Sequence, residues 1–232
     1  MIRVDPLRIV TFVVAFVAGG ALGIPIVLGD PGGGADPARE VRVDLRAFRV
    51  IERESGPVNY YSIVNGAPPY IHAAYRPPYE TTVLGYAVPQ AVRAGVAAVS
   101  WKWRAATLPN GGNECADGRG DSAAVVYVTW RRVLRWYSVK YVWSSVGPKG
   151  VTCNRKRNPF RAQDTVIVES GPPLLEWRTV RISPDTEYRN HFEGGDPTAS
   201  VPDFIGIGIM SDGDQTRSPS EADYADFVIL PK

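Results

Sequence analysis

The segments VSWKWRA (99–105), AAVVYVTW (123–130) and WYSVKYVWSS (136–145) decide the fold of this chain. In the first segment, Val99, Trp101 and Trp103 fall on one side of an extended backbone, and the polar residues between them fall on the other. This period of two is typical of a half-buried β-strand. The second and third segments are joined by only the short connection 131–135, so together they predict a β-hairpin.

Similar short segments, separated by turns, recur along the rest of the chain. We expect further strands at 41–50, 59–64, 70–75, 81–88, 165–169, 177–182, 204–211 and 224–230. One helix is expected at 183–192, because Ser183 is a good N-cap and Pro184 suits the first helical position. Many short strands and one brief helix predict an all-β fold, an antiparallel β-sandwich of the jelly-roll kind, over residues 41–232.

Composition limits the classes of protein to which the chain can belong. With 232 residues and 44% hydrophobic content, it can bury a full core, and its length suits one β domain. The formal charge is only +2, and the basic residues are scattered apart from a cluster at 155–157. A nucleic-acid-binding protein needs a concentrated basic face, so we expect no nucleic-acid partner.

The N-terminal segment 1–29 predicts export. Arg3 and Arg8 precede an uncharged run from Ile9 to Gly29, which as a helix would span roughly 31 Å, enough to cross a bilayer. The sequence leaves open whether it is a cleaved signal peptide or a membrane anchor. Residues 30–40, rich in Gly, Pro and Asp, are expected to be a flexible linker. The body is therefore expected in the periplasm, at the cell surface or secreted, or anchored to the inner membrane.

The two cysteines, Cys115 and Cys153, lie at equal sequence distance from residue 134, the middle of the predicted hairpin connection. An antiparallel ladder would carry them toward each other. Because disulfides form outside the cytoplasm, we predict that they are bonded, with two separate buried thiols as the alternative. Neither cysteine has a CxxC neighbour and the two histidines are far apart, so a metal site at the cysteines is not expected.

The order of several short motifs resembles a known bacterial family. WKWR is followed by VYVTW, YVWSS, NPF, VESG, EWRTVR, EYRNHF, GIGIMSDGDQT and ADYADF. This order is similar to that of the family called domain of unknown function 3047, over most of residues 57–230. The resemblance implies an exported β-sandwich related in shape to carbohydrate-binding modules, and it supplies no reaction. The family pattern places threonine between two aspartates where this chain has Gly213, so Asp212 and Asp214 match and the residue between them does not.

Asp212 and Asp214 are the strongest candidates in the sequence for a site formed by polar side chains. An EF-hand is excluded because Arg217 occupies the position that requires glycine, and too little chain follows for a phosphotransferase of the haloacid dehalogenase type. The metal-site hypothesis that remains is a loop in which Asp212, Asp214 and Asp226 bind a structural cation such as Ca²⁺. The alternative is that these aspartates cap turns. The sequence also contains the tripeptide Arg119, Gly120, Asp121, which we interpret as a chance match to an adhesion motif.

Aromatic residues supply the candidate ligand-binding surface. Alternation places Trp136 on the opposite face of its strand from Tyr137, Tyr141 and Trp143, so Trp136 is the tryptophan expected to reach solvent. A tyrosine-rich segment could line a groove beside it. The candidate ligand-binding residues are Trp136, Tyr60, Tyr61, Tyr70, Tyr75 and Tyr79. Ordinary packing of tyrosine-rich turns is the alternative.

No motif of a known catalytic class occurs, and no catalytic residue is predicted. The first functional hypothesis is an exported, non-catalytic protein that binds a cell-envelope or environmental glycan. The second is a structural or assembly protein of the envelope that binds another protein. A glycoside hydrolase is third, since Glu169, Glu176, Asp212 and Asp214 show no diagnostic spacing.

Overall fold

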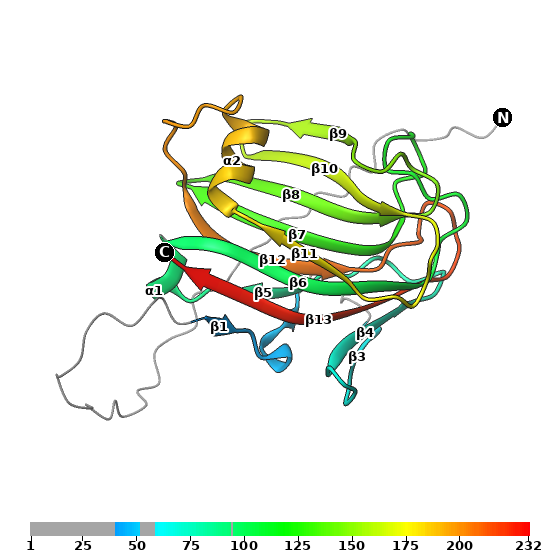
Figure 1. Ribbon diagram of the computed structural model, residues 1–232. Helices are drawn as coiled ribbons and strands as arrows, with labels where there is room; N and C mark the ends of the chain where they lie inside the picture. The colour runs from blue at the N-terminus through cyan, green and yellow to red at the C-terminus, as the bar shows by residue number, and fades with distance from the viewer. Residues whose placement is uncertain (1–39, 52–58, 94) are drawn as a thin grey trace. The chain divides into compact units, whose positions relative to one another are not determined.

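The computed structural model describes residues 40–51, 59–93 and 95–232, which form two β-sheets packed face to face (Figure 1). The strands are β1 (Val41–Arg42), β2 (Arg49–Val50), β3 (Tyr61–Val64), β4 (Tyr70–Tyr75), β5 (Leu84–Ala87), β6 (Val96–Thr107), β7 (Ser122–Arg132), β8 (Arg135–Ser144), β9 (Thr152–Arg157), β10 (Arg161–Ser170), β11 (Arg178–Ile182), β12 (Asp203–Met210) and β13 (Ser220–Pro231). The helices are the 3₁₀ turn η1 (Leu45–Ala47), α1 (Gln90–Arg93) and α2 (Pro184–Phe192).

The six-stranded sheet has the order β11-β6-β13-β4-β3, and β1 also pairs with β13. The seven-stranded sheet has the order β2-β5-β12-β7-β8-β10-β9. This confirms the predicted sandwich. One pair departs from the prediction of a wholly antiparallel fold, because β10 runs parallel to β8. The connection from β8 leads first to β9 at the sheet edge, and β10 then inserts between the two.

The predicted hairpin is present as β7 and β8. Its register pairs Arg132 with Arg135, so Val133 and Leu134 alone form the turn. The same register pairs Val126 with Tyr141 in the middle of the hairpin. The period-two pattern that predicted these strands decides which side chains point into the core, since successive residues of a strand point to opposite faces.

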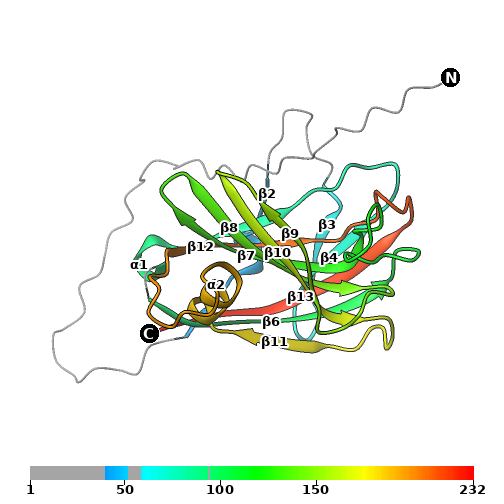
Figure 2. The ribbon, with the colours of Figure 1, turned by 90° about the horizontal axis from the view of Figure 1, so that it is seen from above.

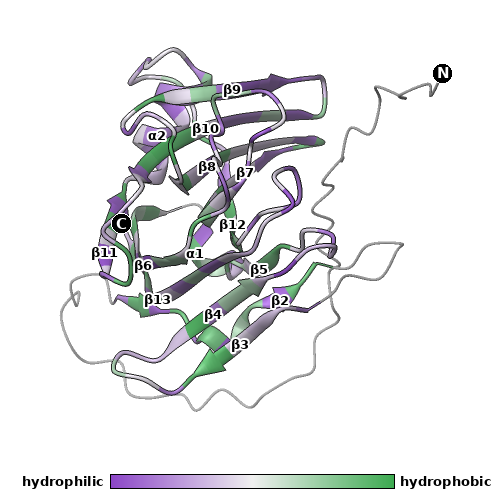
Figure 3. Ribbon diagram, turned by 90° about the vertical axis from the view of Figure 1, so that its right-hand side faces the viewer, coloured by the Kyte–Doolittle hydropathy of each residue, from purple (hydrophilic) through white to green (hydrophobic). Residues whose placement is uncertain are grey.

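Tryptophans dominate the core between the sheets. Trp101, Trp103, Trp130 and Trp143 are all 0–1% exposed. Trp101 lies edge-on to Trp103, with ring centroids 6.0 Å apart, and Trp103 lies edge-on to Trp143 at 6.3 Å. Burying such rings removes more apolar surface from water than any other side chain does. The alternation of buried and partly exposed residues is regular along β4. Figure 3 colours the strands by hydropathy and shows hydrophobic (green) and hydrophilic (purple) stretches in both sheets.

The segment expected as one strand at 41–50 is instead two short strands in different sheets. β1 pairs with β13 and β2 pairs with β5, so the chain crosses from one sheet to the other. η1 makes the crossing, and the side chain of Asp44 accepts a hydrogen bond from the Arg46 N–H at 2.9 Å. Such a side-chain cap competes with strand continuation, which explains the break.

Helix α2 closes one end of the core, as the view from above shows (Figure 2). Its bounds confirm the predicted helix, and Tyr188 and Phe192 share a face with ring centroids 5.5 Å apart. Both rings contact Trp130 and Tyr137. The Ser183 side chain caps no helix N–H, so aromatic packing rather than capping holds the helix in place.

The predicted signal or anchor segment and nearly all of the predicted linker lie outside the described residues. Among the residues that the structure describes, no helix is both long and apolar enough to cross a bilayer. Export and membrane anchoring therefore stay predictions.

Candidate functional site

Polar side chains form a strip across the outer face of the seven-stranded sheet, the face turned away from the core. Val128, Trp130 and Val139 belong to the core, so the residues between them on β7 and β8 point outward. Backbone pairing aligns the outward residues of β7, β8, β10 and β9 in three consecutive rows. The rows are Tyr127, Lys140 and Thr165; Thr129, Ser138, Gln163 and Lys156; and Arg131, Trp136 and Arg161. We call these ten residues the polar strip.

The polar strip has a floor of short side chains between taller ones. Thr129, Ser138 and Gln163 are 3–9% exposed, whereas Tyr127 and Trp136 are partly exposed. The Thr129 and Ser138 hydroxyls lie 3.2 Å apart, within hydrogen-bonding distance, and the Arg161 guanidinium donates to the Gln163 amide oxygen. Hydroxyl, amide, ammonium and guanidinium groups therefore share one face with two aromatic rings.

Glycines on β12 shape the border of the polar strip. Gly208 pairs with Tyr127 in the sheet, and a Cβ added at Gly208 would lie 3.4 Å from the Tyr127 side chain. The tyrosine ring therefore lies against the backbone of β12. At the other end, the Arg131 guanidinium lies 4.9 Å from the centroid of the Trp136 ring, in cation–π contact.

Three carboxylates meet at the end of the strip where β12 finishes. Asp121, Asp212 and Asp214 each offer an oxygen, and these oxygens lie within 4.8 Å of one another. Antiparallel pairing brings the segments together, since the Asp212 N–H donates to the Ser122 carbonyl at 3.0 Å. The Thr81 hydroxyl donates to Asp212 at 2.9 Å, and Asp121 accepts from the Thr216 N–H at 2.6 Å. We call Asp121, Asp212 and Asp214 the acidic cluster; carboxylates in this arrangement are ligands of the type that Ca²⁺ takes.

Burial and mutual repulsion shift the protonation of the acidic cluster. Burial, with the carboxylates of Asp214 and Asp121 adding to it, raises the pKa of Asp212 to about 8 against the opposing charge of Lys140. Burial and the charge of Asp121 also raise the pKa of Asp214. Two carboxyl groups of this cluster therefore bind protons more readily than free aspartate does.

Lys140 belongs to the row of the polar strip that contains Tyr127 and Thr165, and its charge also acts on the acidic cluster. Its ammonium lies 3.8 Å from Glu114 and donates to the Gly120 carbonyl at 3.4 Å. Burial would lower the pKa of Lys140, but the Tyr127 hydroxyl and the carboxylates of Glu114, Asp212 and Asp121 outweigh it and raise the pKa above its ordinary value. Burial raises the pKa of Glu114 to about 7, although Lys140 opposes the shift.

The predicted disulfide between Cys115 and Cys153 is present, with Cα atoms 5.4 Å apart. The geometric reason given for it is wrong, however, because Cys153 lies on β9 and β10 separates that strand from β8. Lys140, Thr165 and Cys153 follow one another across the sheet. The loop after β6 therefore crosses the outer faces of β8 and β10, and the disulfide fixes it to the edge strand.

The structure places the tyrosines of the tyrosine-rich segment in several separate contacts. Tyr75 is 1% exposed, and its hydroxyl donates to the Tyr79 carbonyl at 2.8 Å. Tyr60 stacks on Tyr61 with centroids 4.6 Å apart, and both hydroxyls donate to the Thr82 carbonyl. Tyr60 also lies edge-on to Tyr75, with centroids 5.6 Å apart. Tyr75 is buried, whereas Tyr60 and Tyr61 are partly exposed, so contact of this segment with a ligand stays a prediction.

The two other tyrosines of that segment lie apart from the polar strip. Tyr70 is on β4 in the six-stranded sheet, where it contacts Trp177 edge-on at 5.8 Å and lies 5.2 Å from the Arg104 guanidinium. Tyr79 is 44% exposed in the turn after β4. Of the six predicted ligand-binding residues, only Trp136 belongs to the polar strip.

Asp226 does not join the acidic cluster. It lies on β13 in the six-stranded sheet and pairs with Lys102 at 2.7 Å. Asp121, from the tripeptide interpreted as a chance match, takes its place, and its 0% exposure rules out an adhesion role. The sequence did not identify Asp121 or Glu114 as members of this site. Both lie in the loop between β6 and β7, and that loop meets the end of β12 only because β7 pairs with β12.

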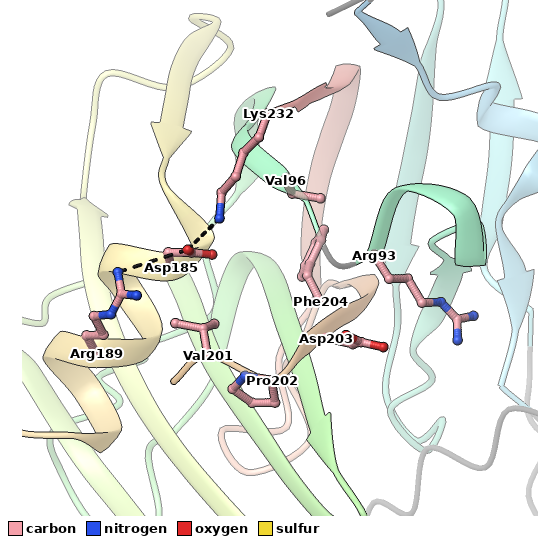
Figure 4. A pocket seen from close by; sticks show the side chains of 9 residues that line it. All are labelled: Arg93, Val96, Asp185, Arg189, Val201, Pro202, Asp203, Phe204 and Lys232. Carbon is pink, nitrogen blue, oxygen red and sulfur yellow. Dashed lines mark hydrogen bonds and ion pairs between the residues drawn. The ribbon is translucent and has the colours of Figure 1, made fainter. Parts of the chain in front are cut away.

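A separate pocket of about 180 Å³ lies beside the start of α2 (Figure 4). Its lining includes Arg93, Arg189 and Lys232 together with Asp185 and Asp203. Asp185 accepts from Lys232 at 2.7 Å and lies 4.0 Å from Arg189. The lining therefore carries three cations and two carboxylates, and two of the cations lie at Asp185.

The fold and its outer polar face define a β-sandwich protein with a hydrogen-bonding sheet surface. A family model described as "Protein of unknown function (DUF3047)" matches residues 80–228, and the chain belongs to that family. This confirms the resemblance seen in the motif order. No curated protein matches the chain.

Several solved structures are similar in outline. A family 11 carbohydrate-binding module from Clostridium thermocellum, in complex with a β-1,3-1,4-mixed-linked tetrasaccharide, is 10% identical with a TM-score of 0.43, covering 85% of this chain and 98% of that one. The xyloglucanase domain of NopAA from Sinorhizobium fredii, in complex with cellobiose, is 10% identical with a TM-score of 0.43, covering 86% and 100%. Endoglucanase 3 from Trichoderma harzianum, of family GH12, is 11% identical with a TM-score of 0.41, covering 84% and 98%. Values this low carry no conclusion about binding or catalysis.

Proposed function

We propose that the polar strip binds an extended glycan without cleaving it. The observation that carries the proposal is that four adjacent strands each bring an exposed or partly exposed residue of the polar strip to one face. These residues are Tyr127, Arg131, Trp136, Lys156 and Arg161. A glycan presents alternating hydroxyl groups and apolar ring faces. Exposed donors such as Arg131 and Lys156 suit the hydroxyls, and the partly exposed Tyr127 and Trp136 rings suit the apolar faces.

The carboxyl groups near the strip support binding rather than hydrolysis. A glycoside hydrolase needs two carboxyl groups facing each other across the bond to be cleaved. Glu114 and Asp212 are 2% and 6% exposed, and Lys140 carries a compensating charge between the loop and the strip. Groups buried in this way suit a structural role better than an acid–base role.

Two tryptophans give a matched test. Trp136 and Trp177 are both partly exposed and both carry an arginine on the ring, Arg131 at 4.9 Å and Arg104 at 4.6 Å. Only Trp136 is on the polar strip. In affinity electrophoresis or calorimetry on polysaccharides and peptidoglycan, Trp136→Ala and Tyr127→Ala should weaken binding by about tenfold or more, and Trp177→Ala should leave it unchanged.

Three results would contradict glycan binding by the strip. The first is that no polysaccharide or peptidoglycan retains the wild-type protein. The second is an equal loss for Trp136→Ala and Trp177→Ala. The third is capture of an envelope protein through the strip in place of a glycan, which would favour the alternative role in envelope assembly.

We infer that the acidic cluster holds a structural cation such as Ca²⁺. Three carboxylates whose oxygens lie within 4.8 Å repel one another, and a divalent ion would relieve that repulsion. Binding to the folded state alone raises stability by mass action. Calcium should therefore raise the melting temperature of the wild type and of Asp226→Asn, but not that of Asp121→Asn. Equal melting temperatures with calcium and with chelator would leave only the turn-capping role.

We also propose that the sandwich works outside the cytoplasm. The support is the Cys115–Cys153 disulfide, since such bonds persist in oxidising compartments. Alkylation of the protein from fractionated cells, without reduction, should leave both cysteines unmodified in the periplasmic or extracellular fraction. Recovery of both thiols alkylated, or of the protein in the cytosol alone, would contradict this proposal.

A further inference from the structure

Two neighbouring turns at one end of the seven-stranded sheet expose apolar side chains. Val133 and Leu134, between β7 and β8, are 82% and 66% exposed, and Phe160, between β9 and β10, is 66% exposed. The Trp136 N–H donates to the Phe160 carbonyl at 2.9 Å, which places the turns side by side. Both turns lie at the end of the sandwich that carries α2 (Figure 1). We call them the paired tips.

The paired tips are strongly basic. Segments 131–136 and 154–161 contain seven Arg or Lys residues and no Asp or Glu. Carboxylates also lie among these cations. Asp164 contacts Arg155 and Arg157, and Glu193 lies 3.7 Å from Arg132. Asp203 is the backbone partner of Arg131 in the sheet. The cations therefore outnumber these three carboxylates by more than two to one.

Like charges crowd at the edge of the tips. Arg155, Lys156 and Arg157 are all exposed on the edge strand β9. An anionic partner would relieve this repulsion, as charge complementarity requires.

The backbone conformation of Val133 shows that the stability of the hairpin does not explain why valine occupies this position. Val133 has φ 54° in a two-residue turn, a conformation that favours glycine or asparagine and disfavours a β-branched residue. An apolar side chain is thus held at the most exposed position of the turn at a conformational cost. Residues in such strained positions cluster where a contact is made.

We propose that the paired tips dock on the surface of an anionic lipid bilayer, with Val133, Leu134 and Phe160 entering the headgroup region and the surrounding Arg and Lys contacting lipid phosphates. Exposed apolar groups flanked by cations have the composition that binds such interfaces. The tips are turns carrying three apolar side chains, far fewer than the twenty or more residues a side of a stable protein interface. A bilayer, into which separate side chains can insert, therefore fits better than an acidic protein.

An environment-sensitive fluorophore on the full chain tests this contact. Leu134→Cys places the label on a tip, and Val146→Cys places it on an equally exposed aliphatic position, 65% against 66%, in the loop after β8. Labelling without reductant keeps the native disulfide. With vesicles containing about 30% anionic lipid, the emission at position 134 should shift to the blue and rise about threefold or more, and that at position 146 should not change. Because both proteins share the same N-terminal segment, its binding cannot mimic the difference.

Charge variants separate docking from insertion of the N-terminal segment. Arg155→Gln with Lys156→Gln should reduce the position-134 response by about tenfold or more, since each cation near an anionic surface strengthens binding roughly fivefold. Lys149→Gln, at an exposed cation outside the tips, is the control and should have no effect. Val133→Asn should fold at least as stably as the wild type and respond less.

Four outcomes would overturn the proposal. The emission at position 134 could stay unchanged on anionic vesicles, or rise equally on vesicles of phosphatidylcholine alone. The label at position 146 could respond as strongly as the label at position 134. A response to a soluble acidic protein without any response to anionic vesicles would assign the tips to a protein partner instead.

Discussion

The Lys140 ammonium lies 3.8 Å from the Glu114 carboxylate, and both side chains are buried under the loop that Cys115 fixes to the sheet. Within the described structure, neither oxygen of Glu114 accepts a hydrogen bond. Lys140 therefore compensates Glu114, and its charge also opposes the upward shift of the Asp212 pKa. The positive charge of Lys140 therefore offsets negative charge both in the loop, at Glu114, and in the acidic cluster.

Replacing Lys140 by Met should destabilise the fold strongly. Removing one partner of a buried pair leaves uncompensated charge, with a typical cost of about 3–5 kcal/mol. Glu114→Gln is the matched control, because Lys140 then keeps Asp212 and Asp121 as partners and the loss should be only about 1–3 kcal/mol. Urea unfolding measures both variants. A loss for Lys140→Met no larger than that for Glu114→Gln would contradict the shared role of Lys140.

Stability should fall as pH rises from about 5 to about 8. The pKa of Asp212 is raised to about 8 and that of Glu114 to about 7, so over this range the folded state holds protons that the unfolded state has already lost. The stabilising proton binding is complete near the unfolded pKa of about 4 and is lost as pH rises through the folded values. The raised pKa of His191 acts in the same direction, because its stabilisation is lost as pH rises through its folded pKa.

The comparison that isolates this effect is Asp212→Asn. The melting temperature of this variant should fall less steeply with rising pH than that of the wild type, because the carboxyl group with the most strongly raised pKa is absent. Asp164 and Glu187 have lowered pKa values, so their stabilisation is lost only as pH falls below about 4 and does not interfere. Parallel pH profiles for the two proteins would refute the assignment to Asp212.

Removal of the disulfide should destabilise the protein by about 4 kcal/mol in the chain-entropy model, since it closes a loop with a sequence separation of 38. Cys115→Ser with Cys153→Ser should show this loss in urea unfolding at equal pH. Hydrogen exchange should rise first in β9 and in the loop around Glu114, because the bond joins those two segments. An unchanged midpoint, or faster exchange spread evenly over both sheets, would contradict a local fastening role.

Local sequence patterns predicted the strands that form the core, but they did not predict which distant strands pair with each other. Trp101 and Trp103 alternate with charged residues, and a strand buried on one face produces that period directly. β9 has the sequence TCNRKR, which lacks an apolar face because it lies at a sheet edge. The parallel pairing of β10 with β8 depends on the path of the chain after Ser144, and residue periodicity carries no information on that path.

The candidate site divides in the same way. Asp212 and Asp214 were identifiable because they directly follow an apolar strand, and Trp136 because alternation set it opposite Tyr137. Asp226 was assigned to them by proximity in sequence, but β13 belongs to the other sheet. Asp121 reaches the cluster only because β7 pairs with β12, a contact between segments far apart in the chain.

Gly213 holds the acidic cluster in shape, and its replacement by Ala should disrupt it. A Cβ at this position would lie 2.1 Å from the Ser218 carbonyl oxygen and 3.0 Å from two carbons of the Tyr75 ring. The Ser218 N–H also donates to the Gly213 carbonyl at 3.0 Å, so the turn cannot open without losing that bond.

We expect Gly213→Ala to cost about 2 kcal/mol or more in urea unfolding, because backbone atoms must move to admit the methyl group. Gly95→Ala is the control, since nothing lies within 4 Å of the added Cβ, and it should change the midpoint little. Gly213→Ala should also abolish any increase in melting temperature with calcium, because Asp212 and Asp214 flank the turn. If both alanine variants unfold at the wild-type midpoint, the close approach of Ser218 to Gly213 does not determine the shape of the cluster.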